Sequence, residues 1–137
     1  MKRQIVFSIF FLLSYSFIQA QNVSKETIQW NATGFKDLDT NETVTNSCQF
    51  VTYGAKKIKW IQDNGKFVVD WNITKSSGTW TNVSQPGSIS FSFADDKVKG
   101  ELTIKKEGSG WLMNLTISGG PSDFNLRYAV SSIERLD

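Results

Sequence analysis

The chain has 137 residues, of which 39% are hydrophobic and 20% charged, so it is neither a disordered chain nor one buried wholly in a membrane. Its formal charge is +2. Without Lys2 and Arg3, which lie in an expected signal peptide, 13 basic residues balance 13 acidic ones, which argues against a basic nucleic-acid-binding surface. The sequence has no His and one Cys, which excludes most catalytic triads, most zinc sites and any intrachain disulfide.

Residues 1–20 have the pattern of an export signal. Lys2 and Arg3 precede an apolar run over 5–13, and Ala20 is a small residue suited to cleavage. The apolar run is shorter than the roughly 20 residues that span a bilayer. We expect loss of 1–20, no membrane span afterwards, and a single domain over 21–137 that is periplasmic or secreted. Cys48 is expected to be buried and unreactive, or else to pair between chains.

Alternation of apolar and polar side chains is the dominant pattern after residue 25, and it predicts β-strands with one core face and one wet face. Turn residues separate the alternating segments. The strongest turn signal is Asn64-Gly65, because a tight hairpin turn needs a positive φ. Residues 34–46 are polar and are expected to form a long loop or a weak strand. The expected strands lie at 25–32, 46–54, 56–62, 66–74, 87–94, 97–106, 111–118 and 123–131.

About eight short consecutive strands predict an all-β fold, an antiparallel meander that closes or nearly closes into a small barrel. The alternative is a β-sandwich. An eight-stranded barrel either fills its interior with side chains or holds one small ligand.

Gly78-Thr79-Trp80, followed by a strand and short hairpins, resembles the Gly-x-Trp element of the small lipocalin-like (calycin) proteins. The resemblance covers roughly residues 58–130 and implies a barrel that binds a small, mainly apolar molecule. In that family the element lies on the first strand, whereas here Trp30 has no glycine two residues before it. A basic residue late in such barrels often packs over that tryptophan. The resemblance gives this role to Arg127, whose alternative is a solvated position.

Aromatic residues dominate the predicted inner face of the barrel. Three interpretations are open: they fill the core, they line an apolar ligand pocket, or exposed Trp rings stack on sugars. The candidate ligand-binding residues are Trp60, Phe67, Trp71, Phe91, Phe93, Trp111, Met113 and Tyr128.

No motif for metal binding or catalysis is complete. Asp37, Asp39 and Asn41 alternate as calcium ligands do, but Glu42 stands where the calcium loop needs glycine. Asp95 and Asp96 lie in an expected turn, where nothing would keep one of them protonated as glycoside hydrolysis requires. We therefore expect no catalytic residue, no metal and no cofactor.

Six Asn-x-Ser/Thr triplets begin at residues 22, 31, 41, 72, 82 and 114. Nine Asn and 24 Ser or Thr among residues 21–137 would give about 1.8 such triplets by random placement. They indicate either a glycosylated secreted protein or Asn and Ser/Thr that share the wet face of a strand.

Together these patterns predict an exported, non-enzymatic binding protein that holds a small apolar ligand. The alternative is a filled barrel that binds a protein or carbohydrate partner through its surface, with residues 34–46, Tyr53 and exposed Trp residues as candidates.

Overall fold

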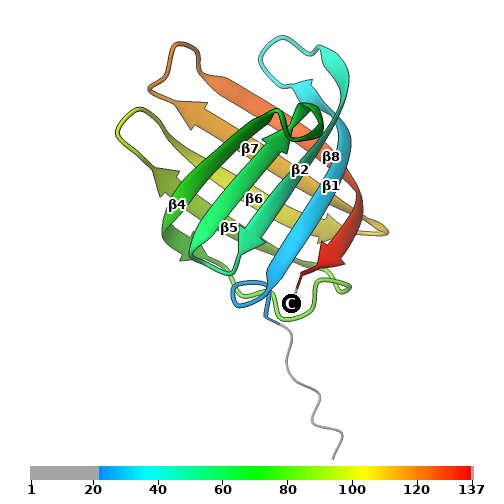
Figure 1. Ribbon diagram of the computed structural model, residues 1–137. Coiled ribbons are helices and arrows are strands. Elements are labelled where there is room, and N and C mark those ends of the chain that lie inside the picture. Colours follow the sequence, from blue (N-terminus) through cyan, green and yellow to red (C-terminus); the bar gives the residue numbers. More distant parts are fainter. Residues whose placement is uncertain (1–21, 137) are drawn as a thin grey trace, which may run out of the picture.

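The computed structural model describes residues 22–136, so the expected signal peptide lies outside the described residues. Eight strands account for most of the described chain, and Figure 1 shows them wrapped into a barrel. Within the described residues no helix is long and apolar enough to cross a membrane. The strands are β1 (Thr27–Asp37), β2 (Thr43–Tyr53), β3 (Lys57–Gln62), β4 (Phe67–Ser77), β5 (Gly87–Ala94), β6 (Lys99–Glu107), β7 (Gly110–Ser118) and β8 (Phe124–Arg135).

Each strand pairs antiparallel with the next, and β8 pairs back onto β1, so the barrel is closed. This confirms the predicted all-β meander and its closure, and it excludes the sandwich. Of the two expectations for residues 34–46, the long loop is wrong and the strand is confirmed. β1 continues to Asp37 and β2 begins at Thr43, and only a tight turn joins them, in which Asn41 has a φ of 65°. Polar side chains on the outer face hid these strand ends.

The two ends of the barrel differ. The turns of the β1–β2, β3–β4, β5–β6 and β7–β8 hairpins lie at one end, which we call the mouth. Residues 22–26, the β4–β5 loop and the end of β8 lie at the other, which we call the base (Figure 1). The short η1 turn (Asp63–Gly65) joins β3 to β4 at the mouth, at the predicted Asn64-Gly65 turn.

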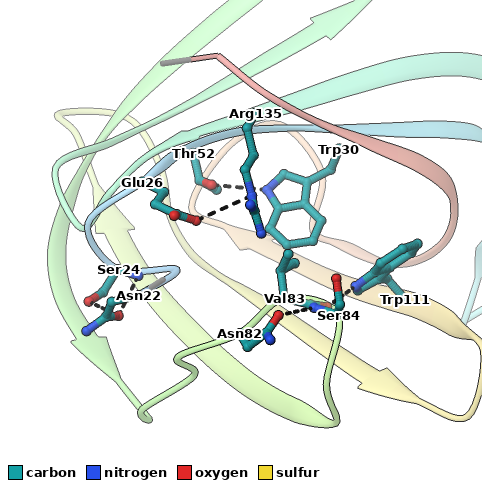
Figure 2. A network of polar contacts seen from close by, with 10 residues as sticks. All are labelled: Asn22, Ser24, Glu26, Trp30, Thr52, Asn82, Val83, Ser84, Trp111 and Arg135. Carbon is teal, nitrogen blue, oxygen red and sulfur yellow. Dashed lines mark hydrogen bonds and ion pairs between the residues drawn. The ribbon is translucent and has the colours of Figure 1, made fainter. Parts of the chain in front are cut away.

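The base is closed by the β4–β5 loop, which folds inward. Trp80 is only 2% exposed, and its ring lies 6.0 Å from that of Trp30. The backbone carbonyl of Trp80 accepts a hydrogen bond of 3.0 Å from the amide of Val23. The carbonyl of Val83 accepts one of 2.9 Å from the indole N–H of Trp111 (Figure 2). The Gly78-Thr79-Trp80 element therefore follows β4 directly and lies in this loop, which keeps the stated difference from the first-strand position of the family.

The middle of the barrel is packed with side chains. Trp71 and Phe93 stack with their ring centroids 4.3 Å apart, and Phe91 and Met113 are fully buried beside them. Thr52 is the one buried polar residue of the described core, and its hydroxyl accepts a 3.0 Å hydrogen bond from the indole N–H of Trp30. Because water is excluded here, any space for a ligand must lie nearer an end of the barrel.

Candidate functional site

A cavity of about 510 Å³ opens at the mouth, and we call it the mouth cavity. Its volume lies within the usual range for small-molecule sites. Its walls come from β1, β2, β3 and β8, which are neighbours around the barrel, and from the β1–β2 turn. It is lined by Phe35, Asp37, Glu42, Val44, Trp60, Gln62, Phe124, Leu126 and Tyr128.

The floor of the mouth cavity is an aromatic cluster. Trp60 stacks on Phe50 with ring centroids 5.5 Å apart and planes 8° from parallel. Tyr128 meets both rings edge-on, at 5.0 Å from Phe50 and 6.5 Å from Trp60. Offset and edge-to-face pairs of this kind hold each ring in one orientation. The rings of the floor are therefore already packed against one another in the absence of a ligand.

The walls are mostly apolar and partly open to solvent, with Asp37, Glu42 and Gln62 as the polar lining residues. Phe35 packs against Tyr128 at 5.5 Å between ring centroids, and Leu126 is buried beside them. Val44 and Phe124 stand at the rim, with 39% and 44% of their surfaces exposed. Large apolar side chains exposed at the edge of an apolar cavity favour binding of an apolar molecule, because the contact removes apolar surface of both from water.

Beside the floor lies Cys48, which is buried as predicted and stands on β2 between Phe50 and the rim residue Val44. Burial raises the pKa of its thiol from 9.0 to about 11, and the indole N–H of Trp60 offsets this only in part. That N–H is itself buried and makes no hydrogen bond of normal geometry within residues 22–136. Burial also raises the pKa of the Tyr128 phenol. At neutral pH both groups are uncharged, so they keep the floor apolar.

The predicted site residues separate into four groups. Trp60 and Tyr128 line the mouth cavity, as an apolar pocket requires. The interior positions predicted for Trp71, Phe91, Phe93 and Met113 are confirmed, but these side chains pack against one another in the filled middle. Trp111 is half-buried at the base.

The interior position predicted for Phe67 is wrong. It is the first residue of β4 and is 63% exposed. It shares the inward parity of Trp71, but it lies where β4 begins at the mouth, and there its side chain is largely exposed. Strand alternation gives the face of a side chain and not its depth along the barrel.

Sequence reasoning missed most of the cavity walls. Phe35 and Val44 fall in the segment expected to be a long loop or a weak strand, and they are paired across β1 and β2. Phe124 lies at the first residue of β8, next to an expected turn. The apolar character of these residues within polar surroundings was the available signal.

Arg127 does not pack over Trp30, and the alternative, a solvated position, is confirmed. Its side chain is exposed, and its Nε donates a hydrogen bond of 3.1 Å to Asn114. A different arginine, Arg135, lies near Trp30 at the base of the barrel. It is on β8 and is paired with Ile28 of β1. Its Nε lies 3.7 Å from a carboxylate oxygen of Glu26 (Figure 2).

The alternating acidic segment forms the β1–β2 turn. The Oδ1 atom of Asp37 accepts hydrogen bonds from the backbone N–H groups of Asp39, at 2.9 Å, and Thr40, at 3.3 Å. Within the described part of the chain, no three His, Cys, Asp or Glu side chains are grouped as metal ligands. The carboxylate of Asp37 therefore supports a turn.

A second, shallower cavity of about 640 Å³ adjoins the mouth on the side of β5, β6 and β7 and shares Phe124 with the first. Its lining is more polar, with Asp39, Asp123 and Lys99 as its charged residues.

Comparison of the chain with protein-family models, curated proteins and solved structures found no match.

Proposed function

We propose that this protein is a non-enzymatic binding protein that holds one small apolar molecule in the mouth cavity. The observation that carries the proposal is a cavity of about 510 Å³ with an aromatic floor, at the open end of a barrel whose base is closed. A closed base supports retention, because a ligand could leave only through the mouth. The meander of eight strands and the resemblance to lipocalin-like proteins favour the same use of the barrel.

The ionisable groups of the mouth cavity favour binding over catalysis. They are Asp37, Glu42 and Tyr128. The raised pKa of Tyr128 leaves its phenol protonated at neutral pH, and Asp37 is engaged in the turn.

The signal-peptide pattern of residues 1–20 supports export to the periplasm or the outside of the cell.

A second candidate is a surface interaction module that binds another protein at the mouth. It is favoured by the exposed side chains of Phe67, Val68 and Phe124, which lie on two different hairpins at that end. The two candidates differ in how deep the partner reaches, since a protein partner would cover the rim and leave the floor empty.

Titration with N-phenyl-1-naphthylamine, a neutral dye that fluoresces in apolar sites, tests the proposal. Val44→Trp places a large ring at the rim of the cavity, and we expect it to weaken dye binding about tenfold or more. Val68→Trp is the matched control, because Val68 is equally a strand valine but does not line the cavity. Equal binding by both variants, or no binding by the unmodified protein, would contradict the proposal and favour the surface module.

A further inference from the structure

We propose that the molecule held in the mouth cavity is an apolar cation, such as an amine with an aromatic or aliphatic body. This inference rests on the proposed function and specifies its class of ligand. The ionisable side chains that line the mouth cavity carry net negative charge. Its nine lining residues include two carboxylates, Asp37 and Glu42, and no Lys or Arg. The adjoining cavity adds Asp39 and Asp123 against one cation, Lys99.

This imbalance is local, because acidic and basic residues balance over residues 21–137. Three carboxylates of the described chain form ion pairs, Asp63 with Lys66, Glu107 with Lys105 and Glu26 with Arg135, whereas exposed ones such as Asp70 and Glu101 form none within residues 22–136. The carboxylates of the mouth cavity form none within residues 22–136. Because the lining has two carboxylates and no Lys or Arg, a cationic ligand would bring the only positive charge into contact with them among the lining residues.

The carboxylates of Asp37 and Glu42 lie at the entrance of the mouth cavity, and only that of Asp37 is held by hydrogen bonds. One oxygen of Asp37 is held by the two backbone N–H groups of the β1–β2 turn, so the carboxylate is fixed at the rim while its other oxygen makes no hydrogen bond within the described residues. Glu42 ends the same turn, where its backbone carbonyl accepts from the amide of Asp37 at 2.8 Å. Its carboxylate has no partner among the described residues. One acceptor is therefore preorganised and the other can move to meet a ligand.

The aromatic lining strengthens the preference for a cation. The rings of Phe35, Trp60, Phe124 and Tyr128 contribute to the cavity, and the face of an aromatic ring attracts positive charge. With rings at the floor and carboxylates at the rim, a matching ligand has an apolar body and a cationic head. The same arrangement repels a carboxylate, which would lose its hydration and gain no partner.

The test uses three probes of one shape and different charge: 1-naphthylmethylamine, 1-naphthalenemethanol and 1-naphthoate. Isothermal titration calorimetry at pH 7 and low salt should give the tightest binding for the ammonium, about tenfold tighter than the alcohol and more than that over the carboxylate. Added salt should reduce this preference, because the rim is open to solvent.

The decisive variant is Asp37→Asn with Glu42→Gln. The side-chain amide introduced by Asp37→Asn keeps an oxygen that can accept from the turn, so circular dichroism should be unchanged while the preference for the ammonium disappears. Asp70→Asn with Glu101→Gln is the control, since it removes the same charge from exposed positions outside the cavity. It should leave the preference almost intact.

The outcomes separate this inference from the proposed function. If the alcohol binds and Val44→Trp blocks it, but the ammonium binds no tighter than the carboxylate, the cation preference is wrong and the proposed function stands. If the preference survives in the Asp37→Asn, Glu42→Gln variant, its assignment to these carboxylates is wrong. If none of the three probes binds, both the inference and the proposed function are overturned.

Discussion

Closure of the base depends on a glycine that leaves room for Trp80. Gly87 is the first residue of β5, and a Cβ built on it would collide with the Trp80 ring, at 2.6 Å from Nε1 and 2.8 Å from Cγ, with Cδ1 closer still. Real Cβ atoms do not approach so closely, so in Gly87→Ala the ring must move. Trp80 cannot move without cost, because its indole N–H donates to the carbonyl of Gln85 at 3.0 Å and its ring contacts Trp30.

The expected cost follows from these contacts. Crowding in a packed site costs about 1–3 kcal/mol, and the lost indole hydrogen bond adds about 1 kcal/mol. Replacing a strand glycine by alanine returns roughly 0.5–1 kcal/mol through the unfolded chain. The net destabilisation of Gly87→Ala is therefore about 2 kcal/mol. Gly110→Ala is the control, because a Cβ there would meet nothing within 4 Å and neither glycine has a positive φ.

Urea denaturation followed by tryptophan fluorescence measures both free energies of unfolding. Gly87→Ala should also change the near-ultraviolet circular dichroism, since the paired rings of Trp30 and Trp80 separate. Gly110→Ala should be as stable as the parent protein or slightly more so. A Gly87→Ala variant with unchanged stability and an unchanged tryptophan spectrum would refute the assignment of Trp80 as the residue that closes the base.

Three further predictions concern the core and the rim. Thr52→Val removes the acceptor of the buried Trp30 N–H and should cost about 1–3 kcal/mol in urea unfolding, whereas Thr52→Ser keeps the hydroxyl and should cost less. Because burial raises the pKa of the Cys48 thiol from 9.0 to about 11, the native state keeps a proton that the unfolded chain releases. This contribution to the free energy of unfolding is complete below pH 9 and is lost as the pH rises toward 11, by about 2–3 kcal/mol. In Cys48→Ala, the free energy of unfolding measured against pH should therefore fall less steeply over this range, and the remaining slope is assigned to Tyr128. Phe67→Ser should change unfolding by no more than about 0.5 kcal/mol, and a larger loss would place its ring in the core.

The sequence was sufficient to predict the strand number, order and closure of the barrel. Alternation set the inward face of each strand, and residues such as Asn64 and Gly65 marked turns through their backbone preferences. Both signals are local, so they remain readable without knowledge of the partners. This is why the buried positions of Trp71 and Met113 were predicted correctly.

The depth of a side chain along the barrel could not be predicted, because it depends on where neighbouring strands end. Phe67 and Trp71 have the same parity on β4, yet one is exposed at the mouth and the other is packed in the middle. The role of Trp80 was hidden for a related reason. It lies in a loop, where no periodicity applies, and it is buried only because the loop folds into the base.

The pairing of β8 with β1 determines the order in which the barrel can be completed. Adjacent hairpins form between neighbours in the sequence, but this last pairing joins residues about a hundred positions apart, such as Asn31 and Ser132. Until β8 is present, β1 and β7 each carry an unpaired edge able to add a strand from another chain. We therefore expect closure to limit the folding rate, and truncation before Phe124 to produce chains that associate through these two edges.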